Sequence, residues 1–278
     1  MTHIVITDSG VGGLLVAAYA ERFVRTRGAA GPVRLTFANA APANDYGYNA
    51  MPSHAVKIET FERFLRNVAQ RYAPDRIYVA CNTLSVLLPE VQAPVPIQGI
   101  IETGVARVVD ALTPESIAMI FGTQTTIDSG VYPRLLRERG VDAARIVSQA
   151  CPGLADVISE DREGARAETE IRRWAAEATA KLPRRDAPVV ACLACTHYGY
   201  RKELFAAALP NAAIVNPNES AVDDLFPRGG TCHEVSVDFV TRYALPPATV
   251  ETLKWLLHEV SPRTVAAMQN FVHVPDLF

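Results

Sequence analysis

Short apolar runs alternate with longer amphipathic stretches along most of the chain. The runs are rich in β-branched residues and bounded by turn residues, which predicts seven strands, at residues 4–7, 33–37, 77–80, 117–121, 146–147, 189–193 and 213–215. Strands that alternate with helices are typical of parallel sheets covered by helices on both faces. The pattern therefore predicts an α/β fold.

The clearest amphipathic stretch follows Pro52. Ser53 is placed to cap a helix whose apolar face carries Phe61, Phe64, Leu65, Val68 and Tyr72. Beyond the Gly229-Gly230 pair the pattern changes, and two further helices are expected at residues 248–260 and 264–272. We expect this C-terminal tail to pack onto the first part of the chain.

An internal repeat relates the two halves of the sequence. Cys81 follows Asp8 by 73 residues, and Cys195 follows Gly122 by the same 73, so a shift of 114 superposes the halves. In each half an apolar run breaks into a Gly/Ser/Thr turn, and a later run ends in Cys. This predicts two pseudo-symmetric α/β domains with parallel-type sheets, the first comprising residues 1–97 and 212–278 and the second residues 98–211.

Composition narrows the classes of function. The 278 residues are 49% hydrophobic and 21% charged with a formal charge of −3, which describes a folded globular chain. No basic stripe, membrane-spanning run or signal peptide is visible, so we expect neither nucleic-acid nor membrane partners. An odd number of cysteines, five, favours reduced thiols in the cytoplasm. Cys192 and Cys195 have the spacing of a metal pair but lack a second pair at comparable spacing, so no metal is expected.

Four polar or thiol-bearing residues fall at or just beyond the ends of predicted strands: Asp8, Cys81, Thr123 and Cys195. Ligands of such folds bind beyond the carboxyl ends of strands, so one cleft can collect all four. Asp8 heads a glycine-rich turn, where it acts either as a helix cap or as an acceptor within the cleft.

Each cysteine taken alone is most simply a small buried apolar residue. Cys81 and Cys195, however, lie at matching positions of the repeat, and each is followed by polar side chains. These are Asn82 and Thr83 after Cys81, and Thr196 and His197 after Cys195. Such groups can hold a carboxylate or an ammonium group, and an imidazole can lower the pKa of a nearby thiol or exchange protons with it. Two thiols on opposite sides of a cleft have the geometry of an acid/base pair acting across one carbon.

Six segments in order resemble the glutamate racemases of the cofactor-independent aspartate/glutamate racemase superfamily. They are Asp8-Ser-Gly-Val-Gly-Gly-Leu14, Tyr46-Gly47, Ala80-Cys-Asn-Thr83, Gly122-Thr123 with Ser129-Gly-Val-Tyr132, Ser148-Gln-Ala-Cys-Pro152 and Cys195-Thr-His-Tyr198. The resemblance covers most of residues 3–220. It implies an active site between two α/β domains, no cofactor, a small amino-acid substrate and a possible homodimer.

The resemblance also implies roles for individual residues. Cys81 and Cys195 would be the paired base and acid that interconvert L- and D-glutamate for peptidoglycan synthesis, with Asp8 assisting Cys81 and His197 assisting Cys195. The positions expected to hold the substrate are Ser9, Tyr46, Gly47, Asn82, Thr83, Thr123 and Thr196.

Three departures from the family pattern concern the substrate. Asp45 replaces the usual Pro before Tyr-Gly and, facing inward, would favour a neutral or cationic side chain. Gly199 replaces a Pro and is expected to loosen its turn. The family places a Glu close to the position of Ser159, and Glu160 is expected to be that residue shifted by one position. Two alternatives therefore stand beside glutamate racemisation: a racemase or epimerase for another amino acid, and a non-catalytic binding protein that keeps the cleft. Retention of both thiols with Asp8 and His197 argues against the second.

Overall fold

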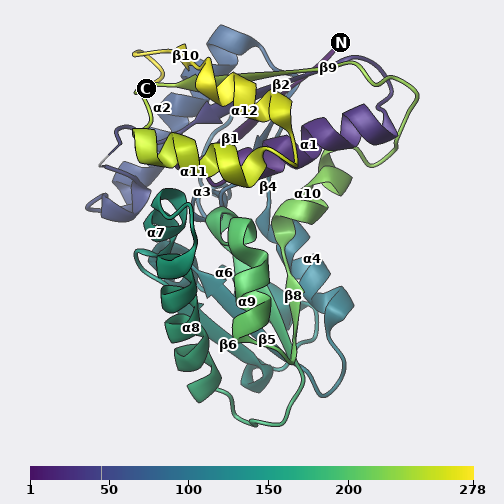
Figure 1. The fold of residues 1–278 in the computed structure, drawn as a ribbon, viewed down its shortest axis with the longest axis vertical. Helices are drawn as coiled ribbons and strands as arrows, with labels where there is room; N and C mark the ends of the chain where they lie inside the picture. Colours follow the sequence, from purple (N-terminus) through teal and green to yellow (C-terminus); the bar gives the residue numbers. More distant parts are fainter. Residues whose placement is uncertain (45) are drawn as a thin grey trace.

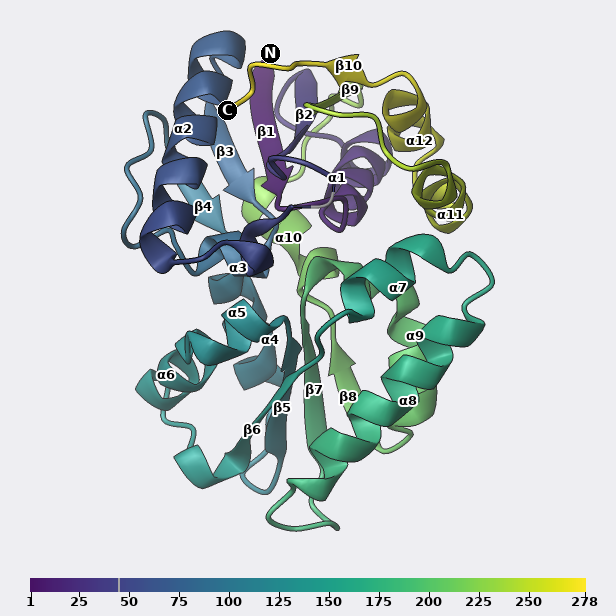
Figure 2. The same ribbon diagram turned by 90° about the vertical axis from the view of Figure 1, so that its left-hand side faces the viewer.

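The computed structural model describes residues 1–44 and 46–278, which form two α/β lobes stacked along the long axis of the molecule (Figure 1). The first lobe is built on a six-stranded sheet and holds both termini, and the second is built on a four-stranded sheet (Figure 2). All strand pairs in both sheets are parallel. The α/β class predicted from the apolar pattern is confirmed.

The two sheets share one strand order. The first runs β10 (Val272–His273), β9 (Val235–Thr241), β2 (Val33–Asn39), β1 (Thr2–Asp8), β3 (Arg76–Val79), β4 (Ile97–Gly99). The second runs β6 (Ile146–Ala150), β5 (Ile117–Gly122), β7 (Val189–Ala194), β8 (Ala212–Val215). The orders β2-β1-β3-β4 and β6-β5-β7-β8 correspond. Shifting β1 and β3 by 114 residues gives 116–122 and 190–193, which overlap β5 and β7. The internal repeat is therefore structural.

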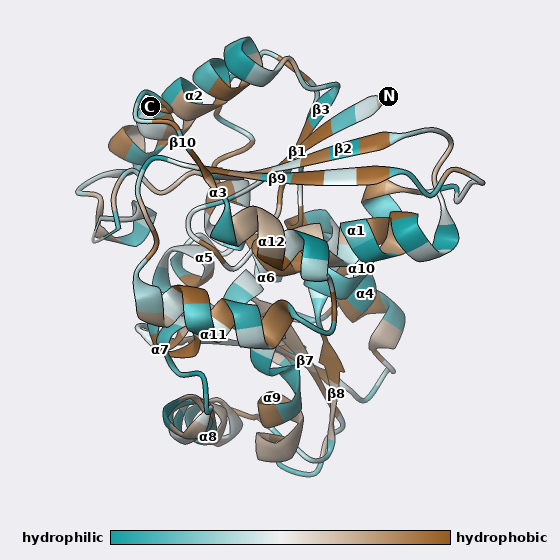
Figure 3. Cartoon of the chain, turned by 45° about the horizontal axis from the view of Figure 1, so that its top comes forward, coloured by the Kyte–Doolittle hydropathy of each residue, from teal (hydrophilic) through white to brown (hydrophobic). Residues whose placement is uncertain are grey.

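Helices cover both faces of each sheet, and the alternation of side chains along the strands decides which helix packs where. In β1, Ile4 and Ile6 pack towards α1 (Leu14–Arg27), whereas Val5 packs towards α2 (His54–Tyr72). In the second lobe, α8 (Ala165–Ala180) and α9 (Lys202–Ala208) cover one face of the sheet, and α4 (Ile101–Ala111) and α6 (Val131–Glu138) cover the other. Figure 3 shows the matching alternation of polar and apolar residues around α1 and α11 (Pro247–Leu257). The helices of the first lobe are α1 (Leu14–Arg27), α2 (His54–Tyr72), α3 (Asn82–Ser85), α11 (Pro247–Leu257) and α12 (Pro262–Gln269).

The second lobe contains α5 (Gln124–Asp128), α6 (Val131–Glu138), α7 (Leu154–Glu160), α8 (Ala165–Ala180) and α9 (Lys202–Ala208). Short 3₁₀ turns are η1 (Tyr48–Ala50), η2 (Ala143–Arg145) and η3 (Thr196–Arg201). The helix expected after Ser53 is confirmed as α2, and the Ser53 hydroxyl accepts a hydrogen bond from the Val56 amide at 3.3 Å.

The chain crosses between lobes through α4 (Ile101–Ala111) and returns through α10 (Pro217–Leu225), which pack against each other. The boundaries predicted from the sequence, after residue 97 and before residue 212, fall at the first residues of β4 and β8. Because β4 pairs with β3 and β8 pairs with β7, we propose placing the domain boundaries at the ends of these strands instead.

The C-terminal tail adds two strands to the first sheet that the sequence pattern did not predict. Strand β9 pairs with β2, and β10 pairs with β9. The two expected tail helices are present as α11 and α12. Helix α12 packs on β9, while α11 reaches α7 of the second lobe. The C-terminal tail therefore contacts both lobes, the first through α12 and the second through α11.

Candidate active site

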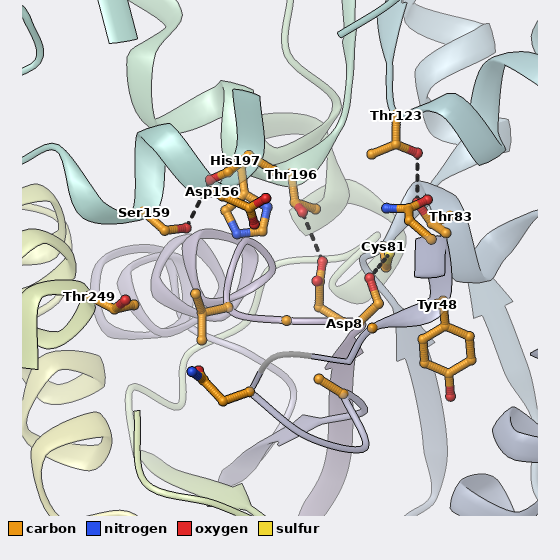
Figure 4. Close-up of a pocket in the computed structure, with 18 of the residues that line it drawn as sticks. Asp8, Tyr48, Cys81, Thr83, Thr123, Asp156, Ser159, Thr196, His197 and Thr249 are labelled. Carbon is orange, nitrogen blue, oxygen red and sulfur yellow. Dashed lines mark hydrogen bonds between the residues drawn. The ribbon is translucent and has the colours of Figure 1, made fainter. Parts of the chain in front are cut away.

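A cavity of about 520 Å³ lies between the lobes at the carboxyl ends of both sheets. It is lined by residues that follow β1, β3, β5 and β7, as the sequence predicted for a cleft of this fold. Ten of the residues expected at the site line it: Asp8, Ser9, Gly47, Cys81, Asn82, Thr83, Thr123, Cys195, Thr196 and His197. Figure 4 shows Asp8, Thr196 and His197 near its centre, with Cys81 and Thr83 on one side and Ser159 and Thr249 on the other.

Asp8 ends β1 and is only 1% exposed. Its carboxylate accepts hydrogen bonds from the Thr196 hydroxyl, at 2.8 Å, and from the backbone amides of Gly10 and Gly13. Burial nonetheless raises the pKa of Asp8 from its ordinary 3.8 to about 6, against the opposing effect of these donors. The cap of α1 is Gly13, so Asp8 is a cleft carboxylate rather than the N-cap itself.

Cys81 follows β3 and begins α3, with 4% of its surface exposed. Its sulfur lies 3.0 Å from the Ser9 hydroxyl, which is its side-chain hydrogen-bond partner among the described residues. Burial and then the negative charge of Asp8 raise the pKa of the Cys81 thiol to about 12. Asp8 thus acts on Cys81 through its electric field, while Ser9 makes the direct contact.

Cys195 follows β7 and is 6% exposed. Burial raises the pKa of its thiol well above the ordinary value, and the backbone amides of His197 and Tyr198 oppose that shift. The Nδ1 atom of His197 lies 4.0 Å from the Cys195 sulfur. Burial lowers the pKa of His197 to about 4, so its imidazole is neutral at physiological pH.

Hydrogen bonds join the two lobes across the cleft. Thr196 of the second lobe donates to Asp8 of the first, and the hydroxyls of Thr83 and Thr123 lie 2.9 Å apart (Figure 4). Gly12 is a point of close approach between the lobes: a Cβ there would lie 2.6 Å from His197 Nδ1. A glycine at position 12 of the turn after Asp8 is therefore needed for this close contact between the lobes.

Three expectations need separate treatment. Tyr46 is 41% exposed and is not among the described residues that line the cavity, so its contact with substrate stays a prediction. Asp45 lies outside the described residues. Gly199 does not loosen its turn: it is buried in η3, where a Cβ would lie 2.8 Å from the Asn216 side chain, so the tight packing of Asn216 requires glycine.

Several lining residues were not anticipated from the sequence. Tyr48, from the turn after Gly47, is 1% exposed and lines the cavity. The tail contributes Tyr243, Leu245, Pro246 and Thr249, and α7 contributes Asp156; Ser159 and Glu160, which the sequence had already singled out, also line the cavity. The Tyr-Gly-Tyr sequence was a signal for Tyr48, whereas no local pattern marks the tail residues.

Neither a metal centre nor a membrane segment is found in residues 1–44 and 46–278. These residues contain no group of three or more His, Cys, Asp or Glu side chains arranged to hold a metal ion. No described helix has both the length and the apolar character needed to cross a bilayer. The chemistry that the cleft offers is that of two thiols, three carboxyl groups (Asp8, Asp156 and Glu160), an imidazole and hydroxyl or amide donors.

Comparison with known proteins finds relatives among the amino-acid racemases. The family model of Asp/Glu/hydantoin racemases matches residues 23–225. The glutamate racemase of Syntrophus aciditrophicus is 30% identical over 235 residues, covering 78% of this chain and 76% of that protein. That of Symbiobacterium thermophilum is 29% identical over 238 residues, covering 80% and 78%.

Solved structures show the same fold. The glutamate racemase isoform RacE1 of Bacillus anthracis superposes with a TM-score of 0.70 at 21% identity, covering 92% of this chain and 94% of that one. The Francisella tularensis enzyme, solved with D-glutamate, has a TM-score of 0.70 at 20% identity and the same coverage. Together with the match over most of its length, these likenesses show that the chain belongs to the Asp/Glu/hydantoin racemase family and is an isomerase of the amino-acid racemase type.

Proposed function

We propose that this protein interconverts L- and D-glutamate by proton transfer between two thiols, without a cofactor. The observation that carries the proposal is the pair Cys81 and Cys195, which come from equivalent loops of the two lobes and line one cavity. Asp8 lies close enough to both that its charge raises the pKa of each thiol. A substrate α-carbon held between the lobes would face one sulfur on each side.

The reaction follows from that placement. One sulfur, as thiolate, takes the α-proton and becomes a thiol, while the electron pair of the C–H bond moves into the substrate carboxylate as an enolate. The other thiol gives its proton to the opposite face and becomes the thiolate, so the centre is inverted and the charges balance. Positioned acid–base groups of this kind contribute about 10²–10⁴ in rate. Donors around the enolate, from Asn82, Thr83 and Thr196, would stabilise the developing charge.

The buried carboxylate and imidazole are proposed to set the protonation of the thiols. In the structure both thiols keep their protons at neutral pH, because burial raises the pKa of each. The neutral His197, whose Nδ1 atom lies 4.0 Å from the Cys195 sulfur, is placed to orient that thiol, and its lowered pKa makes it too weak a base to hold the proton of the thiol itself. The charge of Asp8 makes a thiolate at Cys81 a stronger base, and an α-proton, being a weak acid, requires one.

Likeness to the glutamate racemases supports glutamate as the substrate. We further propose that the biological role is to make D-glutamate in the cytoplasm for peptidoglycan. A bacterial strain that needs external D-glutamate tests that role directly. Expression of the wild-type protein should restore growth without D-glutamate, and expression of Cys81→Ala should not. Failure of the wild-type protein to restore growth, despite normal expression, would contradict the proposed role in peptidoglycan synthesis.

A second candidate is racemisation of an amino acid with a neutral or cationic side chain. Asp156 and Glu160 lie four residues apart on α7 and both line the cavity. Partial burial, and next the charge of Glu160, raise the pKa of Asp156. None of the described lining residues is Lys or Arg, so this wall is acidic without a balancing side-chain cation.

Proton NMR in deuterated water separates the candidates. The protein is mixed with each L- and D-amino acid in turn, and loss of the α-proton signal is followed. Exchange and inversion confined to glutamate would support the first proposal. Exchange with basic or neutral amino acids, and none with glutamate, would replace it by the second. Absence of exchange with every amino acid would contradict both.

A further inference from the structure

Tyr132 is buried away from the cavity, yet its hydroxyl is bonded to a residue that lines it. Tyr132 lies in the first turn of α6 in the second lobe and is 1% exposed. Its hydroxyl donates to Oδ1 of Asn82, in the first lobe, at 2.8 Å. Burial raises the pKa of Tyr132 well above its ordinary value, so the hydroxyl keeps its proton and stays a donor.

This hydrogen bond leaves the other end of the Asn82 amide unused. Asn82 is 2% exposed and lines the cavity, and its Nδ2 atom has no hydrogen-bond partner among the described residues. A buried donor without a partner is unfavourable, and buried polar groups are nearly always hydrogen-bonded. A carboxylate oxygen in the cleft is an acceptor of the required kind.

We propose that Tyr132 is a positioning residue that fixes the Asn82 amide with Nδ2 facing the cleft, where it donates to a carboxylate of the substrate. This rests on the proposed amino-acid substrate. Since the two side chains come from different lobes, the amide is held in this orientation only while the lobes are docked. The donor is thus assembled together with the two-thiol site.

A glycine in α4 makes room for this arrangement. A Cβ on Gly104 would lie 2.5 Å from the Tyr132 hydroxyl, and 3.1 Å from Pro217. Alanine is a better helix former than glycine, so Gly104→Ala should keep α4 while displacing the hydroxyl from Asn82. Gly104→Ala and Tyr132→Phe therefore break the same hydrogen bond by different routes.

The test compares Tyr132→Phe, Gly104→Ala and the double variant with Tyr78→Phe as the matched control. Tyr78 is also 1% exposed, and its hydroxyl donates to Asp224 at 3.1 Å, away from the cavity. Each single variant should lower kcat/KM about three- to tenfold, the range of one net hydrogen bond, with the loss in KM. The double variant should be no worse than Tyr132→Phe, because the hydroxyl that the added Cβ would displace is then absent. Tyr78→Phe should keep the wild-type KM.

An NMR measurement separates failure of this inference from failure of the proposed function. The side-chain amide signal of Asn82, assigned by its loss in Asn82→Ala, should move and gain mobility in Tyr132→Phe and stay unchanged in Tyr78→Phe. An unmoved signal, an unchanged KM, or additive losses in the double variant would each overturn the positioning role. If the wild-type protein exchanges no α-proton, the proposed function fails, and the amide signal still decides whether Tyr132 holds Asn82.

Discussion

Replacing Asp8 with asparagine should change how the stability of the folded protein depends on pH. Burial raises the pKa of this carboxyl from 3.8 to about 6, so the folded chain holds its proton to a higher pH than the unfolded chain does. Stability from this group is therefore complete below about pH 4 and is lost as the pH rises through about 6. Above that pH the folded protein keeps an ionised carboxylate that is buried.

The size of the effect follows from the shift. A difference of about two pKa units, at 1.36 kcal/mol each, corresponds to a loss of about 3 kcal/mol between about pH 4 and pH 7. The amide introduced by Asp8→Asn cannot ionise and avoids this loss. Its NH₂ group faces donors that served the carboxylate, which destabilises the variant by an amount independent of pH. The difference in free energy of unfolding between Asp8→Asn and wild type should therefore rise with pH, whatever its starting value.

Urea unfolding at half-unit steps from pH 4 to pH 8 measures this difference. Asp186→Asn, in the exposed loop before β7, removes a carboxylate from the surface and serves as the control. For Asp8→Asn the difference from wild type should climb most steeply between about pH 4 and pH 6, whereas the control should stay flat. A flat difference for Asp8→Asn would refute the raised pKa, and with it the view of Asp8 as a buried cleft carboxylate.

Three further predictions concern the contacts around Asp8. Thr196→Val removes the 2.8 Å hydrogen bond that lowers the pKa of Asp8, so the pKa of Asp8 should rise and the acid limb of the kcat/KM profile should move to higher pH. The value of kcat/KM should also fall about ten- to hundredfold. Thr196→Ser should retain both, and an unmoved limb in Thr196→Val would contradict the coupling. Gly12→Ala places a Cβ 2.6 Å from His197 Nδ1 and should abolish activity while the far-UV circular dichroism is preserved, unlike Gly31→Ala, where nothing lies within 4 Å and activity should remain. Because burial lowers the pKa of His197 to about 4, its Cε1 proton should not titrate by NMR between pH 5 and 8; a midpoint near 6.5 would show an exposed imidazole.

The apolar pattern predicted most of the fold because β1, β2, β3, β5 and β7 are largely buried, whereas β6 and β8 are only partly so. Strands β4, β9 and β10 escaped prediction for separate reasons. Strand β4 is three residues long beside prolines, and β10 is two residues long and exposed. Strand β9 includes Ser236 and Asp238, whose polar side chains interrupt the apolar run; Asp238 pairs with Arg34 on β2. That pairing is a tertiary contact, which local sequence does not report.

The sequence predicted the site residues that lie at or just beyond strand ends. It did not predict those that reach the site through contacts between segments far apart in the chain. Cys81 and Cys195 fall at equivalent turns of a repeat, and Asp8 ends β1, the strand that pairs with β3, so the fold alone brings the three together. The hydrogen bond from Thr196 to Asp8 joins residues 188 positions apart, and the tail residue Thr249 reaches the cleft only because α11 packs on α7. Such contacts depend on how the lobes dock.

Deuterium exchange by single-thiol variants tests the two-thiol account most directly. Wild type, Cys81→Ala, Cys195→Ala and the control Cys151→Ala, whose buried thiol does not line the cavity, are incubated with L- and D-glutamate in deuterated water. Wild type and Cys151→Ala should exchange the α-proton with inversion, while Cys81→Ala and Cys195→Ala should fold normally and produce no inversion from either enantiomer. Full inversion by either of these two variants would contradict proton transfer between Cys81 and Cys195.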